Sequence, residues 1–251
     1  MDTWQSSASR VLVVIPAWNE RESVAAVVAD ILRMVPRADV LVVDDGSADD
    51  TSEVAAAAGA LVCRLPFNLG VGGAMRAGYR YALRQGYDVV VQVDADGQHD
   101  ARYVPALLEA LAGADVVVGA RFAGEGSYAA AGPRRWAMRL LAGGLSMLAH
   151  QPLSDVTSGF RAVNRRGIRL FATHYPSEYL GDTVESLVIA LRTGCRVEQV
   201  PVSMRPRSSG QASQNTVRSS LYLTRAVVAL GLALVRRWPT GHGVVVAQEP
   251  A

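Results

Sequence analysis

A run of acidic and amide side chains follows an apolar stretch near the middle of the chain, in the order VVVQVDADGQHD. Residues two apart in extended backbone point the same way, so Asp94, Asp96 and Gln98 could meet one cation. Ligands that are all oxygen favour Mg²⁺ or Mn²⁺, which keep positions open for water or substrate phosphates. The competing interpretation is a solvated acidic turn, since Asp and Gly are ordinary turn residues. We interpret the next two residues, His99 and Asp100, as turn residues without a chemical role.

A second acidic stretch, VVDDGSADDTSEV, places Asp44 and Asp45 at the end of another apolar run. Ser47 or Asp49 could cap the helix expected to follow, which would be a purely structural role. Two adjacent carboxylates exceed what a cap needs. One of them could therefore hydrogen-bond the ribose or base of a nucleotide, as acids do at other strand ends.

The basic side chains point to phosphates and carboxylates, because the chain has arginines but no lysine. A diphosphate held between a divalent cation and arginines would account for both signs of charge. Taken singly, each of these arginines is as well explained by a structural or surface role. The net charge of +2 gives no argument for nucleic-acid binding. The arginines considered are Arg121, Arg134, Arg135, Arg161, Arg205 and Arg207.

Apolar runs of strand length alternate with helical patterns through the first half of the chain, which predicts βαβ units. The expected fold is α/β, with a Rossmann-like, mainly parallel central sheet flanked by helices on both faces. Ligands of such sheets bind beyond the carboxyl ends of the strands, where both acidic stretches fall. The glycine-rich stretch FNLGVGGAMRAG indicates either close approach to a ligand or close helix packing, and Met75 excludes a dinucleotide fingerprint.

We divide the chain into a tail (1–9), a first half (10–121), a second half (122–215) and a C-terminal region (216–251). The C-terminal region contains the apolar segment Ala226–Val235, which is too short to span a bilayer and is bordered by arginines. A helix there would suit either the membrane surface or the protein core. The chain has two cysteines, each within an apolar run, which favours a reducing, cytoplasmic location.

Six stretches occur in an order that resembles the family 2 glycosyltransferases of GT-A fold, over residues 10–215. They are IPAWNE, VVDDGSADDT, FNLGVGGAMRAG, DADGQHD, GAR and DVTSGFR. The greatest similarity is to the dolichol- and polyprenol-phosphate sugar (mannose or glucose) synthases. The resemblance implies an inverting hexosyltransferase that depends on Mg²⁺ or Mn²⁺. Its donor would be a nucleotide-diphosphate sugar of the GDP-mannose or UDP-glucose type, and its acceptor a polyprenyl or dolichyl phosphate.

The resemblance also implies roles for single residues. Those that would hold the nucleoside are Pro16, Trp18, Glu20 and Asp45. The metal on the diphosphate would be held by Asp94, Asp96 and Gln98. Arg121 would lie near the sugar or acceptor phosphate, Arg207 on the diphosphate and lipid phosphate, and Asp155 near the acceptor. Together with Asp96, these last three are the residues assigned to catalysis.

Two other functions stay open at this point. The acceptor could be the hydroxyl of a glycan or a lipid-linked sugar, and a carboxylate such as Asp155 or Glu185 would then have to take its proton. The chain could instead be a non-catalytic nucleotide-binding partner of a membrane protein. A lipid acceptor would place the chain peripherally at the inner face of the membrane. A membrane-protein partner and self-association into a homo-oligomer are left open, and no nucleic-acid partner is expected.

Overall fold

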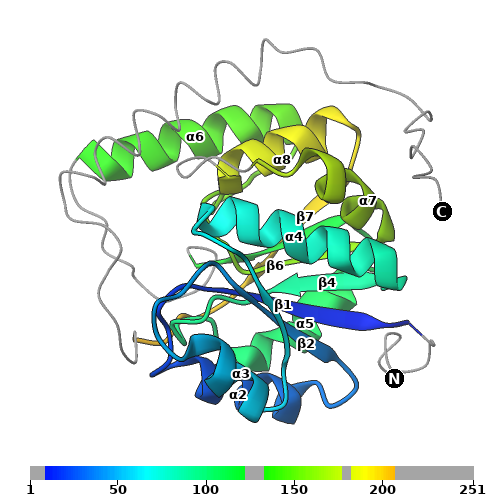
Figure 1. The fold of residues 1–251 in the computed structure, drawn as a ribbon. Helices are drawn as coiled ribbons and strands as arrows, with labels where there is room; N and C mark the ends of the chain where they lie inside the picture. The colour runs from blue at the N-terminus through cyan, green and yellow to red at the C-terminus, as the bar shows by residue number, and fades with distance from the viewer. Residues whose placement is uncertain (1–8, 122–132, 177–181, 207–251) are drawn as a thin grey trace.

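Seven strands form one sheet in the computed structural model, which describes residues 9–121, 133–176 and 182–206 (Figure 1). The order across the sheet is β3-β2-β1-β4-β6-β5-β7. All neighbours pair in parallel except β6, which runs antiparallel to both β4 and β5. The strands are β1 (Val11–Ala17), β2 (Asp39–Asp44), β3 (Leu61–Arg64), β4 (Val89–Gln92), β5 (Val116–Ala120), β6 (Arg161–Asn164) and β7 (Val197–Pro201).

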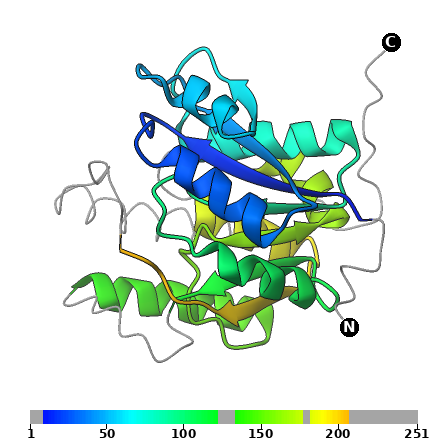
Figure 2. The same cartoon turned by 90° about the horizontal axis from the view of Figure 1, so that it is seen from below.

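Helices cover both faces of the sheet, which confirms the layered α/β fold. Apolar side chains of α2, α3 and α5 form one core with the sheet, and those of α4, α6, α7 and α8 form the other. Figure 2 looks onto the face that carries α2, α3 and α5. The helices are α2 (Val24–Met34), α3 (Thr51–Ala57), α4 (Gly70–Gln85), α5 (Val104–Ala110), α6 (Pro133–Ala149), α7 (Arg165–His174) and α8 (Asp182–Arg192), and a 3₁₀ turn, η1, spans Ala101–Tyr103.

Strands β1 and β5 are apolar because both of their faces are covered. Every residue of β1 and β5 is buried. Helix α4 lies very close to β1, since a Cβ added at Gly78 would be 2.5 Å from Cγ1 of Val14. At Gly78, therefore, the glycine serves helix packing, one of the two roles considered for the glycine-rich stretch.

Strand β6 is not among the strands that the apolar runs of the sequence predict. The strand has four residues, and arginine and asparagine stand at its ends. A polar, four-residue strand lacks the apolar run by which the others are recognised. Because β6 lies between β4 and β5, the two predicted halves of the chain contribute to one sheet.

Among the described helices, none combines the length and apolar character needed to cross a bilayer. Residues 1–8 of the predicted tail and the whole C-terminal region 216–251, with its apolar segment Ala226–Val235, lie outside the described residues.

Candidate functional site

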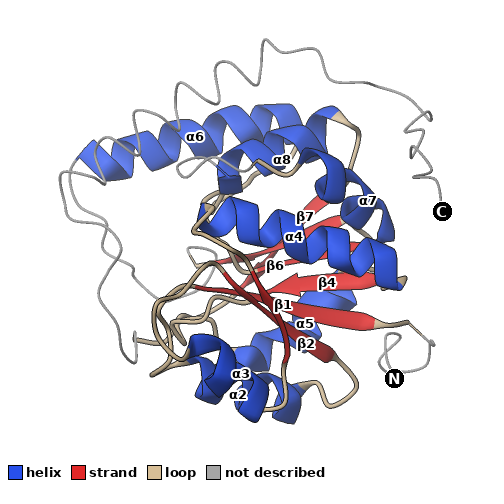
Figure 3. Ribbon diagram, in the orientation of Figure 1, coloured by secondary structure: helices blue, strands red, loops and turns tan. Residues whose placement is uncertain are grey.

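The loops after β1, β2 and β4 gather at one end of the sheet, as expected for parallel strands (Figure 3). Ala17 at the end of β1 pairs with Asp44 at the end of β2, and Val14 of β1 pairs with Gln92 at the end of β4. The two acidic stretches predicted from the sequence therefore come to the same edge. This edge is the candidate site.

Residues 94–98, called the metal turn below, leave the sheet just after β4. The backbone here is a turn rather than the extended chain assumed from the sequence, and Gly97 has a φ of 76°. Oδ1 of Asp96 accepts a hydrogen bond from the backbone N–H of Gln98 at 3.0 Å. The Asp94 side chain is 39% exposed, so its carboxylate can reach a ligand at the edge. The two-residue spacing thus brings the acids to one turn, but not through strand alternation.

His99 and Asp100 have structural roles that correct their interpretation as plain turn residues. The His99 side chain is 3% exposed, and its ring stacks on Phe160 with centroids 4.8 Å apart. Its Nδ1 accepts a hydrogen bond from the backbone N–H of Asp94 at 2.9 Å. Burial acts to raise the pKa of Asp100, but hydrogen bonds from Arg102 and Arg205 outweigh it and lower the pKa to about 2. Both residues therefore support the metal turn from inside the protein.

The donor set of the metal turn fits a divalent cation of the Mg²⁺ or Mn²⁺ type. Its carboxylate and amide oxygens are the ligands that these ions prefer. One of these ligands, the Asp94 carboxylate, lies close to the backbone of Gly159, because a Cβ added at Gly159 would be 3.3 and 3.4 Å from its two oxygens. Within the described ranges, no three His, Cys, Asp or Glu side chains converge into a complete cage. Such an ion would take its remaining ligands from water and substrate, as Mg²⁺ commonly does.

The adjacent acids Asp44 and Asp45 have different tasks. Burial would raise the pKa of Asp44, but hydrogen bonds from Ser47 and Ser52 outweigh it, so its pKa is lowered. Asp45 accepts hydrogen bonds from the backbone N–H groups of Leu69 and Gly70, both at 2.7 Å. Burial raises the pKa of Asp45. Asp45 therefore anchors the start of α4, and its contact with a nucleoside stays a prediction.

The loop after β1 carries the other residues expected to meet the nucleoside. Trp18 is 46% exposed at the edge, whereas Pro16 is buried within β1. Glu20 accepts a hydrogen bond from the hydroxyl of Ser23 at 2.7 Å. Asn19 has a φ of 55°, and its side chain accepts a hydrogen bond from the backbone of the loop after β2. The loop is thus held in place while it displays an aromatic ring.

Arg121, the residue after β5, forms a bidentate ion pair with Asp155. Nε of Arg121 donates to Oδ2 of Asp155 at 2.7 Å, and Nη2 donates to Oδ1 at 3.0 Å. The Asp155 side chain is fully buried. Burial acts to raise its pKa, but the hydrogen bonds and charge of Arg121 outweigh it, so the pKa of Asp155 is lowered. An acid held this way is a poor proton acceptor, which counts against Asp155 as a general base and makes it the partner that orients Arg121.

Of the remaining arginines of the sequence analysis, the structure describes the side chains of Arg161 and Arg205, and both are bonded to other protein groups. Arg205 pairs with Asp30 and Asp100 on the side of α2. Arg161 is buried in β6, where its guanidinium donates to Thr183 O and to Ser186 Oγ, each at 2.7 Å. The Arg207 residue and the Arg134 and Arg135 side chains lie outside what the structure describes.

Sequence reasoning missed one acid, Asp182, the first residue of α8. Burial raises its pKa to about 6, with Arg161 opposing the rise and Asp94 adding to it. Nothing in the sequence distinguished it from Glu185 three positions later, which is half-buried in the same helix. Asp182 faces a buried arginine, and this can be seen only once β6 and α8 are packed together.

Comparison with known proteins agrees with this geometry. The family model described as "Glycosyl transferase family 2" matches residues 12–171. Undecaprenyl-phosphate mannosyltransferase of Micrococcus luteus is 34% identical over 239 residues, covering 91% of this chain and 93% of that protein. Polyprenol monophosphomannose synthase of Mycolicibacterium smegmatis is 31% identical, covering 85% and 84% respectively.

A solved structure supports the fold. Glucosyl-3-phosphoglycerate synthase of Mycobacterium tuberculosis, in complex with Mn²⁺, UDP and phosphoglyceric acid, aligns with a TM-score of 0.68. The alignment covers 90% of this chain and 78% of that one, at 22% identity, so it bears on the GT-A fold alone. Taken with the family match and the relatives that span nearly the whole chain, these findings show that the chain is a glycosyltransferase and belongs to glycosyl transferase family 2.

Proposed function

We propose that this glycosyltransferase moves a hexose, with inversion, from a nucleotide-diphosphate sugar to a polyprenyl phosphate. The observation that carries the proposal is the metal turn at the carboxyl edge of the sheet, where a diphosphate can bind. The relatives named for undecaprenyl-phosphate and polyprenol mannosyl transfer support the acceptor and point to GDP-mannose as a first donor to test, beside UDP-glucose.

In this proposal the two carboxylates of the metal turn, with Gln98, hold Mg²⁺ or Mn²⁺ on the diphosphate. A cation held there would supply positive charge to offset the charge that grows on the leaving group. Trp18 and Glu20 bind the nucleoside together with Pro16 and Asp45. Arg121, fixed by Asp155, orients the sugar or the acceptor phosphate. Arg207, outside the described residues, is proposed to contact the diphosphate and lipid phosphate.

The state of Asp155 favours a phosphate acceptor over a hydroxyl acceptor. A phosphate is already anionic and needs little help from a general base, whereas a hydroxyl must lose a proton as it attacks. Asp155 is held as the anion by Arg121, with both oxygens engaged. Transfer to a hydroxyl would have to rely on another acid, such as Glu185. A polyprenyl phosphate acceptor would place the chain at the inner face of the membrane.

Transfer is tested with Mn²⁺, a panel of nucleotide sugars including GDP-mannose and UDP-glucose, and polyprenyl phosphate, with glycolipid as the product measured. Unphosphorylated polyprenol is the control acceptor, and a chelator should abolish transfer. We expect Asp96→Asn to lower activity about 100-fold, because it removes an anionic metal ligand.

The matched control is Asp88→Asn. Asp88 precedes β4 and pairs with Arg165 at the other end of the same strand, so its loss should leave transfer near the wild-type level. Undiminished transfer by Asp96→Asn would refute the metal role. Transfer to polyprenol as readily as to its phosphate would refute the proposed acceptor.

A further inference from the structure

Arg205 joins two acidic side chains that lie far apart in the sequence. Its Nη1 donates to Oδ2 of Asp30 in α2 at 2.6 Å, and its Nη2 donates to Oδ1 of Asp100 at 2.7 Å. Its backbone N–H also donates to the carbonyl oxygen of Gln98 at 2.9 Å. Next to it, Met204 and His99 form an antiparallel bridge. Arg205 therefore contacts Gln98, the last residue of the metal turn, through its backbone, and holds Asp100, two residues further on, through its side chain.

Arg205 lies in the middle of a series of ion pairs in which positive and negative side chains alternate. The series begins on the surface of α2, passes Asp100 just after the metal turn, and ends at an exposed arginine. The order is Arg33, Asp30, Arg205, Asp100 and Arg102. The side chains of the two outer arginines are 65% and 69% exposed, whereas that of Asp100 is 2% exposed. Exposed ion pairs are weak, and shielding from water strengthens them. The two inner pairs, which Arg205 makes with Asp30 and Asp100, should therefore contribute most to holding these segments together.

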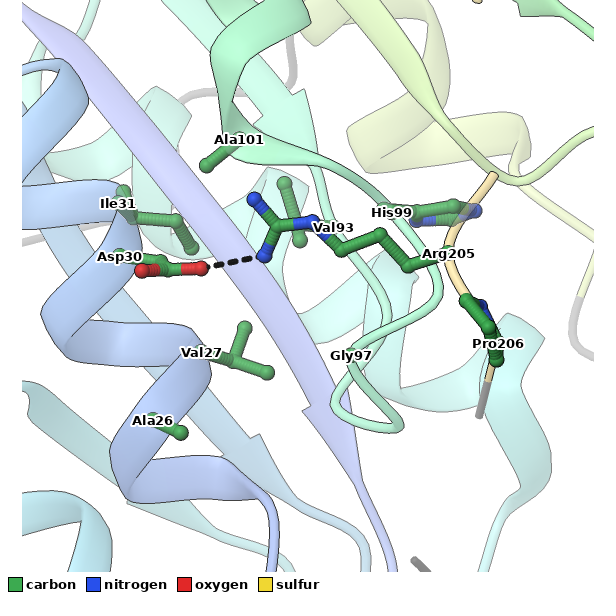
Figure 4. A pocket seen from close by; sticks show the side chains of 10 residues that line it. All are labelled: Ala26, Val27, Asp30, Ile31, Val93, Gly97, His99, Ala101, Arg205 and Pro206. Carbon is green, nitrogen blue, oxygen red and sulfur yellow. Dashed lines mark hydrogen bonds and ion pairs between the residues drawn. The ribbon is translucent and has the colours of Figure 1, made fainter. Parts of the chain in front are cut away.

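A cavity of about 150 Å³ separates the metal turn from α2 (Figure 4). Apolar side chains of α2, among them Val27 and Ile31, line one side, and Gly97 lies on the other. Atoms that line such a gap lack packing partners on that side, so a direct bond across it supplies contact that packing does not. The Arg205 side chain reaches across this region to Asp30. It thereby bonds α2 directly to the segment of Met204 and Arg205, which lies beside the metal turn.

We propose that Arg205 is a positioning residue that holds the metal turn against α2 in the conformation that binds the divalent cation. It acts through Gln98 and Asp100 and does not itself touch the ion. The inference rests on the proposed metal role of Asp94 and Asp96. A carboxylate ligand binds well only when the groups behind it fix its orientation, and the bonds of Arg205 provide this support.

The inference is tested on the full chain with Mn²⁺ alone, by titration calorimetry, and by hydrogen–deuterium exchange of peptides that cover residues 94–100. We expect Arg205→Gln to weaken Mn²⁺ binding about tenfold and to speed exchange in the metal turn. The Mn²⁺ affinity and the exchange rate of Arg205→Lys should lie between those of Arg205→Gln and the wild type, because an ammonium group keeps the charge but lacks the planar guanidinium that spans two carboxylates. Arg33→Gln is the matched control, since it removes an exposed arginine from the same Asp30 and should change neither measurement.

Should Arg205→Gln fail to fold, Asp30→Ala removes one of the same bonds from a helix surface and should weaken Mn²⁺ binding by a smaller factor. Wild-type affinity for Mn²⁺ in the folded variants would overturn the positioning role, even if the wild type transfers sugar normally. A wild-type chain that binds no Mn²⁺ would instead refute the proposed metal site, and the inference with it. Faster exchange in Arg205→Gln without any change in affinity would show that the bonds serve stability alone, which also refutes the inference.

Discussion

At the scale of single residues, Asp182 is an acid whose surroundings disfavour its charge. Its Oδ2 is buried without a hydrogen-bond partner among the described residues, and Arg161 nearby spends its bonds on carbonyl and hydroxyl oxygens. Burial raises the pKa of Asp182 to about 6. The folded protein therefore prefers the protonated form of this side chain over a range of pH in which an unfolded chain would release the proton.

The titration of Asp182 predicts how stability should depend on pH. A folded-state pKa raised above the unfolded value gives stability that is present below about pH 4 and is lost as pH rises through about 6. Asp182→Asn cannot ionise, so its free energy of unfolding should rise relative to wild type by about 2 kcal/mol between pH 4.5 and 8. Urea unfolding at three pH values measures this difference. Asp50→Asn, at the exposed start of α3, controls for the loss of a surface carboxylate. A difference for Asp182→Asn that stays constant with pH would contradict the burial argument.

The metal turn shows what sequence can and cannot predict at this scale. The acids could be placed at the edge of the sheet because an apolar strand leads directly to them. Their support could not be predicted, because Phe160 and Arg205 are about 60 and 105 residues away from the side chains that they contact. The turn geometry was also missed, since spacing alone does not distinguish a strand end from a turn closed by Gly97.

At the scale of elements, the start of α4 depends on an acid from another loop. Leu69, the residue before the helix, has no side chain that can cap it, and Oδ1 of Asn68 accepts one hydrogen bond from the N–H of Gly70 at 3.1 Å. Asp45, after β2, accepts shorter hydrogen bonds from the N–H groups of both Leu69 and Gly70. A carboxylate at a helix N-terminus also interacts favourably with the helix dipole. Asp45 therefore links β2 to α4 in the absence of any ligand.

Replacing Asp45 should consequently cost stability before any effect on substrate is measured. We expect Asp45→Ala to lower the free energy of unfolding by about 1–2 kcal/mol, the usual cost of losing a helix cap. Urea unfolding without ligand measures it. Asp50→Ala provides the control, because Asp50 precedes α3 but makes no side-chain cap bond. Equal effects of the two substitutions would show that the two bonds of Asp45 contribute nothing beyond those of an ordinary surface acid.

At the scale of the whole molecule, the sheet joins the two predicted halves of the chain. The alternation of apolar runs and helices predicted the parallel strands, of which β1 and β5 are buried on both faces. The position of β6 could not be predicted, since a four-residue strand that begins with Arg161 carries no apolar signal. Its antiparallel place between β4 and β5 follows from tertiary contacts, among them the bonds that Arg161 makes to α8.

Arg161 therefore offers a test of whether the sheet unfolds as one unit. Its side chain is buried and donates to Ser158 O and Thr183 O, so Arg161→Gln should remove a charged donor from two buried carbonyl oxygens. We expect a loss of about 3 kcal/mol, with far- and near-ultraviolet circular dichroism still reporting a single, coincident urea transition. Arg169→Gln, an exposed arginine of α7, controls for loss of charge and should change stability little. Separate transitions in Arg161→Gln would mean that the second half can detach while β1, β2 and β4 stay folded, contrary to a sheet in which β6 is an internal strand.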